Sequence, residues 1–164
     1  MGKLIVEESA DELFFMAESD IISTKVLFAG TYYPADRMYN IICFHTTQAA
    51  EKLLKSYIIN SGKEANRTHN LDNLCKAAIK IDNSFIKIAD DCVLLNTYTP
   101  DIRYTNKNKI TKQDMVTLLK SLETICNFPP IKTMRDSFNK KHKYKIIAEA
   151  AANPGKKQPG RKKQ

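Results

Sequence analysis

Apolar residues recur every three to four positions through most of this 164-residue chain, and this periodicity constrains the fold more than any other feature. The strict alternation that marks a half-buried strand is nearly absent. A chain of this length can bury one full core. The sequence therefore predicts an all-α protein, an antiparallel up-and-down bundle of four to five helices followed by a basic C-terminal extension.

Capping residues divide this pattern into separate helices. Ser9 and Glu12 have the spacing of a capping box, which opens the first helix, and Gly30 predicts its end. Pro34 suits the first turn of a second, long helix, which is expected to end near residues 61–62. The apolar seam of the first helix is predicted to consist of Leu13, Ala17, Ile21, Thr24 and Phe28.

Three further helices are expected before residue 129. Thr68 can cap a short third helix, and a fourth carries apolar residues at 3-4-3 spacing over 85–95. Thr111 and Asp114 have the spacing to cap a fifth, which Pro129-Pro130 ends. The predicted inward residues of the fifth helix are Met115, Leu118, Leu122 and Ile125.

The charge of the chain is concentrated at its C-terminal end. Residues 1–128 hold 15 Lys and Arg against 16 Asp and Glu, whereas residues 129–164 hold 11 against 2. We therefore divide the chain into a bundle over 1–128 and a basic amphipathic extension over 129–164. The last twelve residues, 153–164, are expected to be disordered and either to attach to RNA or DNA phosphates or to serve only as a solubilising tail.

Other features of the sequence exclude several classes of protein. The four cysteines form no CxxC pair and lie within apolar helical patterns, which is typical of buried free thiols in a reducing cytoplasm. The acidic N-terminus is unlike a signal peptide, and no apolar run is long enough to span a membrane. No phosphate-binding loop, dinucleotide fingerprint or zinc motif occurs. The sequence predicts no metal site and no cofactor.

The second predicted helix places polar residues beside its apolar seam. His45, Gln48 and Lys52 share one face, at spacings of three and four. His45 is either a neutral core histidine or a polar contact in a groove beside the bundle. Lys55 follows Glu51 at i+4, which favours an ordinary helix salt bridge. The neighbouring apolar seam is predicted to contain Ile41, Ile42, Ala49, Leu53 and Tyr57.

Two more sites are candidates for ligand contacts. His69 is expected in the first turn of the third helix, where it either packs the turn or adds a donor to an anion site. Arg103 and Tyr104 lie in a loop before the fifth helix. They either bind a phosphate and stack on a base, or hold the loop to the bundle through a carboxylate.

Three stretches of the chain resemble the signature stretches of the HEPN family (higher eukaryotes and prokaryotes nucleotide-binding domain). They are "FHTTQAAEKLLKSYI", "RTHNLDNL" and "YTPDIRY", and the resemblance covers about residues 10–126. It implies a helical bundle similar to the substrate-binding C-terminal domain of kanamycin nucleotidyltransferase. It also implies a homodimer, with His45, Gln48 and Lys52 lining a groove or a partner surface.

Many HEPN proteins are metal-independent ribonucleases, often toxins paired with a small nucleotidyltransferase. These carry an Arg, four to six residues and then a His, because the His moves the ribose 2′-OH proton while the Arg stabilises the phosphorane. Arg103 matches the Arg, but positions 108–110 read Asn, Lys and Ile. The pairing of Arg135 with His142 matches only formally, because it lies in the basic extension.

The sequence therefore favours a HEPN protein that is not an enzyme. The resemblance implies a homodimer that binds a nucleotide or another phosphate-bearing ligand and docks a minimal nucleotidyltransferase. The ligand-binding candidates are His45, Gln48, Lys52, His69, Arg103 and Tyr104. The alternative is an RNA-cleaving toxin that uses His45, His69 or His142 as general base, with Arg135 and His142 as weak catalytic candidates.

Overall fold

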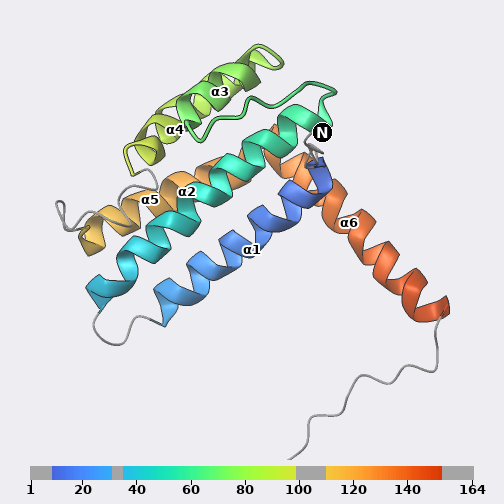
Figure 1. The fold of residues 1–164 in the computed structure, drawn as a ribbon, viewed down its shortest axis with the longest axis horizontal. Helices are drawn as coiled ribbons and strands as arrows, with labels where there is room; N and C mark the ends of the chain where they lie inside the picture. Colours follow the sequence, from blue (N-terminus) through green and yellow to red (C-terminus); the bar gives the residue numbers. More distant parts are fainter. Residues whose placement is uncertain (1–8, 31–34, 99–109, 153–164) are drawn as a thin grey trace, which may run out of the picture.

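A computed structural model describes residues 9–30, 35–98 and 110–152 of the chain. Two long helices form its centre: α1 over Ala10–Ala29 and α2 over Ala35–Asn60. They run antiparallel and pack along their whole length (Figure 1). The described residues contain no strand, so the predicted all-α class is confirmed.

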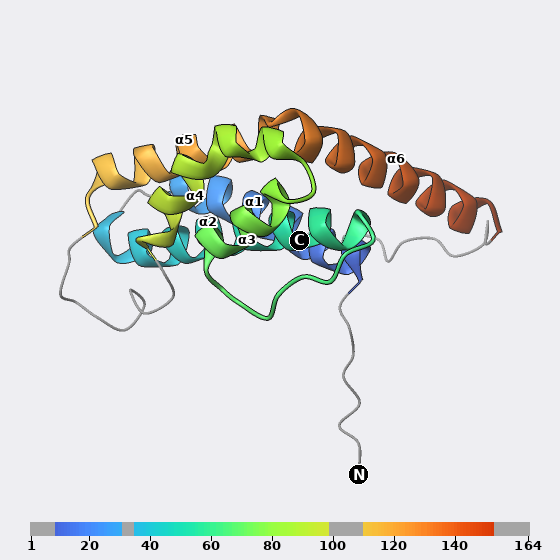
Figure 2. The same cartoon turned by 90° about the horizontal axis from the view of Figure 1, so that it is seen from above.

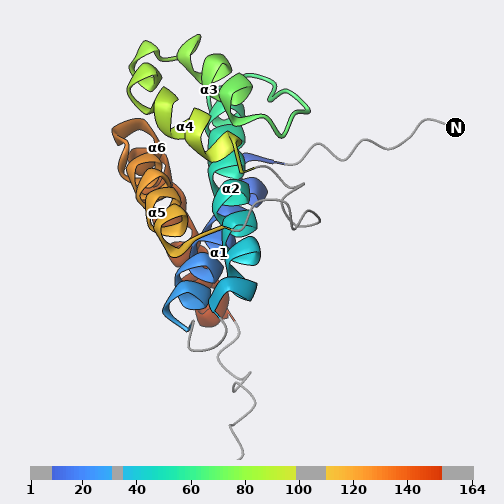
Figure 3. The same ribbon diagram turned by 90° about the vertical axis from the view of Figure 1, so that its left-hand side faces the viewer.

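The remaining helices surround α2. They are α3 over Leu71–Ile79, the 3-10 helix η1 over Asn83–Ile88, α4 over Ala89–Asn96, α5 over Lys112–Asn127 and α6 over Pro129–Ala152. The pair α3 and α4 covers one side of α2, and α5 covers another (Figures 1 and 3). The C-terminal part of α6 projects beyond the bundle (Figure 2).

The two capping boxes that the sequence predicts are both formed. The Ser9 side chain accepts a hydrogen bond from the Glu12 backbone N–H, and the Glu12 carboxylate accepts one from the Ser9 N–H. Thr111 and Asp114 make the same reciprocal pair at the start of α5. These bonds hold the pKa values of the Glu12 and Asp114 carboxyls below their usual range.

Three local predictions are wrong. Asn70, not Thr68, caps α3, and its side chain accepts from the Asn73 N–H. His69 therefore precedes the helix instead of lying in its first turn. Ile41, expected in the apolar seam of α2, is 44% exposed, whereas Ile42 is fully buried. The sequence alone does not distinguish the two positions, because Thr68 and Asn70 are both good capping residues only two positions apart.

One continuous core includes residues from every helix. The predicted inward residues of α5 are all buried, as are those of α1 except Phe28, which is half-buried. The core continues past residue 128, because Ile131, Met134 and Phe138 of α6 are buried in it. The expected disorder of residues 153–164 lies outside the described residues, as does Pro34.

Candidate functional site

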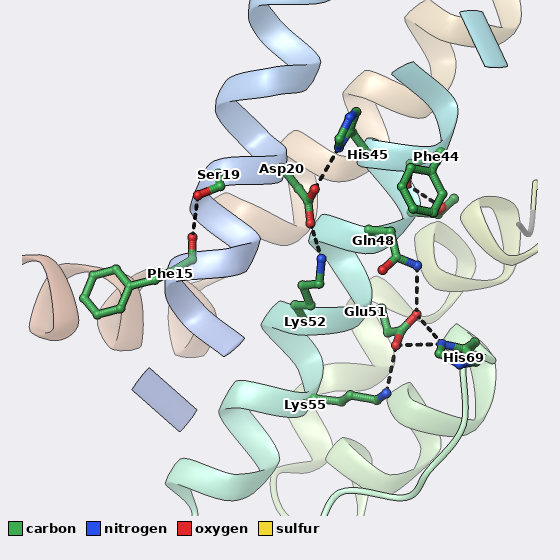
Figure 4. A network of polar contacts seen from close by, with 11 residues as sticks. Phe15, Ser19, Asp20, Phe44, His45, Gln48, Glu51, Lys52, Lys55 and His69 are labelled. Carbon is green, nitrogen blue, oxygen red and sulfur yellow. Dashed lines mark hydrogen bonds and ion pairs between the residues drawn. The ribbon is translucent and has the colours of Figure 1, made fainter. Parts of the chain in front are cut away.

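Polar side chains along one edge of α2 meet partners from two neighbouring segments. We call this group the polar row; its members are His45, Gln48, Glu51, Lys52 and Lys55 of α2, Asp20 of α1, and His69 (Figure 4). Helical spacing aligns the α2 members, since residues three and four apart lie on the same face. The antiparallel packing of α1 brings Asp20 to this face.

Asp20 is bound by two side chains of α2. Its Oδ1 lies 2.8 Å from His45 Nδ1, and its Oδ2 lies 2.5 Å from Lys52 Nζ. The residue is only 8% exposed. A carboxylate at this depth loses most of its hydration, and the two bonds replace it.

Glu51 is the centre of a second group, further along the same helix. It is 5% exposed and accepts from Lys55 Nζ at 2.8 Å, the i,i+4 salt bridge that the sequence favours. Gln48 Nε2 lies 3.4 Å from Glu51 Oε2. Segment 61–70 turns back along α2, so that His69 Nδ1 reaches Glu51 Oε1 at 3.0 Å.

The two carboxylates fix the orientation of both imidazole rings. An ionised carboxylate only accepts hydrogen bonds, so Nδ1 of His45 and Nδ1 of His69 each carry the proton that is donated. In a neutral ring the other nitrogen, Nε2, then holds a lone pair. A histidine held in this way can act as a hydrogen-bond acceptor or as a general base.

Lys52 and Lys55 of the polar row have N–H groups that their carboxylate partners do not use. A lysine ammonium has three N–H groups, and the contact that Lys52 makes with Asp20 uses one of them. The same holds for Lys55 with Glu51. Both lysine side chains are 14% exposed, while that of His69 is 75% exposed. The lysine head groups are thus positioned by carboxylates, and His69 stands at the outer edge of the row.

The other predicted site residues do not belong to this group. Arg103 and Tyr104 lie outside the described residues. Arg135 donates from Nε and Nη2 to Glu18, at 2.6 and 3.1 Å, and this bond raises the pKa of its guanidinium. The His142 ring packs on Phe15, with 4.5 Å between ring centroids. Both residues thus attach α6 to α1.

Sequence reasoning missed Asp20 altogether. Its position holds the signal that would have found it, because Asp20 lies beside Ala17, Ile21 and Thr24 on the buried face of α1. A carboxylate on such a face needs a partner from another element. Glu51 entered the sequence argument only as the partner of Lys55, although His69 and Gln48 also converge on it.

Comparison with family models decides which group of proteins this fold represents. The model described as HEPN domain matches residues 10–132, three quarters of the chain. The chain belongs to the HEPN domain family. Searches of the curated proteins and of the solved structures each found no significant match.

The HEPN match includes every member of the polar row. It ends at residue 132, in the first turn of α6. In the part of the chain that the structure describes, no helix is long and apolar enough to cross a bilayer. Each of the four cysteines is a buried free thiol, as the sequence predicts.

Proposed function

We propose that this HEPN protein binds a nucleotide or another phosphate-bearing ligand along the polar row and does not cleave RNA. The observation that carries the proposal is the pairing of Lys52 and Lys55 with buried carboxylates, which holds two ammonium groups in place before any ligand arrives. Pre-positioned donors reduce the entropy lost on binding. The Arg103 segment lacks the histidine of the ribonuclease pattern, which supports a binding role over a catalytic one.

The two carboxylates limit how strongly this site attracts an anion. With neutral histidines, the charges of Lys52 and Lys55 are balanced by those of Asp20 and Glu51. A phosphate therefore gains hydrogen bonds from remaining N–H groups and little net Coulomb attraction. We expect micromolar to millimolar affinity that weakens only slightly as salt rises.

Calorimetry at low salt with a panel of ribonucleoside mono- and triphosphates tests this proposal. His69→Ala and Gln48→Ala are the best variants, because His69 is largely exposed and Gln48 makes only a long bond, so both should fold. Each should weaken binding about threefold to tenfold. Lys76→Met is the matched control, since Lys76 is an exposed lysine on α3 paired with Asp72 at i+4. Absence of heat with every nucleotide would refute the proposal.

We also propose that the protein is a homodimer, and exposed apolar side chains on α1 support this. Phe15, Ile22 and Val26 lie on one face of α1, opposite its core face, and are 37%, 59% and 64% exposed. Such a stripe favours a protein interface. Light scattering should show a dimer, and Ile22→Lys with Val26→Lys should give a monomer. Docking of a minimal nucleotidyltransferase rests on the family resemblance alone.

A second candidate function is metal-independent RNA cleavage, which the two carboxylate–histidine pairs favour. Nε2 of His45 or His69 would take the proton of a ribose 2′-OH. That oxygen would attack the adjacent phosphorus and the bond from phosphorus to the 5′ oxygen would break. The leaving 5′ oxygen would take up a proton from water, and the phosphorus would remain as a 2′,3′-cyclic phosphate. A gel of RNA incubated with the protein distinguishes the two functions. Cleavage lost in His45→Ala or His69→Ala, but kept in His142→Ala, would establish the enzyme.

A further inference from the structure

A pocket of about 350 Å³ lies between α1 and α5, on the edge of α1 away from the polar row. Its walls are mainly apolar and include Ile21 and Phe28 of α1 and Leu119 and Leu122 of α5. Both helices are labelled in Figure 3, which views the molecule from the left-hand side of Figure 1. An engineered apolar cavity of about 150 Å³ is enough to bind benzene. This pocket has room for one ring and a polar substituent.

Thr24 forms part of the pocket lining and carries an unused hydrogen-bond donor. The residue is 1% exposed, and among the buried side-chain polar atoms of the described residues its Oγ1 alone has no hydrogen-bond partner. A buried threonine in a helix usually donates its hydroxyl to a backbone carbonyl one turn earlier. Thr46 on α2 does so, with 2.7 Å between its Oγ1 and the Ile42 carbonyl oxygen. The Thr24 hydroxyl has no such bond, and its Oγ1 is buried beneath the pocket surface, so a ligand atom reaches it only when a neighbouring side chain shifts.

The charges around the pocket cancel in pairs. Arg135 is neutralised by Glu18, and at the rim the exposed Lys25 and Glu123 have opposite signs. These four charges also act on the thiol of Cys126 in the lining. The two cations lower its pKa, and the two carboxylates raise it. Burial is the largest effect and raises that pKa to about 11. The pocket thus offers no net charge to a ligand.

We propose that this pocket binds a small uncharged aromatic molecule whose hydrogen-bond acceptor is met by the Thr24 hydroxyl. The apolar walls of α1 and α5 bury the ring. A charged ligand would give up its hydration without gaining a matching partner, because Arg135 in the lining already binds Glu18. The inference is independent of phosphate binding at the polar row.

Titration of the full chain with benzamide, followed by methyl NMR, tests the pocket. Benzamide should shift the methyl signals of Ile21 and Leu122 and should bind at least tenfold more tightly than benzoate or benzylammonium, which have similar shapes and opposite charges. Equal affinities for the three probes, tighter binding of benzoate, or no shifts in these methyl groups would each overturn the proposal.

Thr24→Val separates the hydroxyl from the shape of the pocket. This variant keeps the side-chain volume and removes a group that has no partner, so it should fold. It should weaken benzamide about fivefold to tenfold and leave toluene unchanged. Leu119→Trp, which fills the pocket, should abolish the binding of both probes. His69→Ala should leave benzamide binding intact, so failure of the polar row cannot be mistaken for failure of the pocket.

Discussion

Asp20 and Thr24 lie one turn apart on the buried face of α1, yet their surroundings differ in kind. Asp20 faces α2, where His45 and Lys52 bind both of its carboxylate oxygens. Thr24 borders the gap toward α5, and its hydroxyl has no partner. The first edge of α1 is closed by paired charges, and the second remains partly open.

This difference suits the two edges of α1 to ligands of different chemistry. On the Asp20 edge, polar groups are bound to each other, so a ligand must share donors that already have an acceptor. On the Thr24 edge, the walls are mainly apolar, and the one buried hydroxyl among them has no hydrogen-bond partner. The first edge suits a polar ligand such as a phosphate, and the second suits an uncharged ring.

The largest expected effect is a difference in stability between two leucines of α5, one beside the pocket and one away from it. Leu118 is fully buried and does not line the pocket, so Leu118→Ala should lower the free energy of unfolding by about 4 kcal/mol. Leu122 borders the existing pocket, and Leu122→Ala should cost only about 2 kcal/mol. Urea denaturation measures both values. Equal losses would mean that the pocket is closed in solution.

Asp20→Ala should reduce stability by about 3 kcal/mol, because it leaves Lys52 largely buried without its partner. Asp72→Ala is the control, since Asp72 forms an exposed i,i+4 pair with Lys76 and should cost less than about 0.5 kcal/mol. Thermal and urea unfolding of the two variants give the comparison. An Asp20→Ala protein as stable as the Asp72→Ala protein would show that the polar row contributes nothing to folding.

The smallest effect should come from the two buried threonines. Thr46→Val removes a hydrogen bond that is made and should cost about 1 kcal/mol. Thr24→Val removes a hydroxyl without a partner and should be neutral or slightly stabilising. Unfolding curves of both variants, run side by side, measure the difference. A larger loss for Thr24→Val would show that the Thr24 hydroxyl makes a hydrogen bond in solution.

The sequence was sufficient for the helices and their inward faces, because both depend on local spacing and capping. Ser9 with Glu12, and Thr111 with Asp114, are examples of predictions that use four residues or fewer. The sites depend on contacts between distant segments, which local spacing does not contain. The register of α1 on α2 pairs Asp20 with Lys52, and the path of segment 61–70 brings His69 to Glu51.

The same limit explains why the pocket could not be foreseen. Ile21 and Thr24 belong to the predicted seam of α1, and Leu122 to that of α5, so each was expected to be covered. All three are buried, but a gap remains between the helices that carry them. Packing of this kind depends on the distance between two helices, and that distance follows from the whole bundle.

The three histidines allow the most direct test of phosphate binding at the polar row. His45 and His69 lie in the row, and His142 packs on Phe15 outside it, so one ¹⁵N spectrum compares the row with a reference histidine. Single His→Ala variants assign the three rings. Addition of a nucleoside triphosphate should shift the ring signals of His45 and His69 and leave those of His142 in place. Shifts confined to His142, or no shifts at a saturating concentration, would contradict the account.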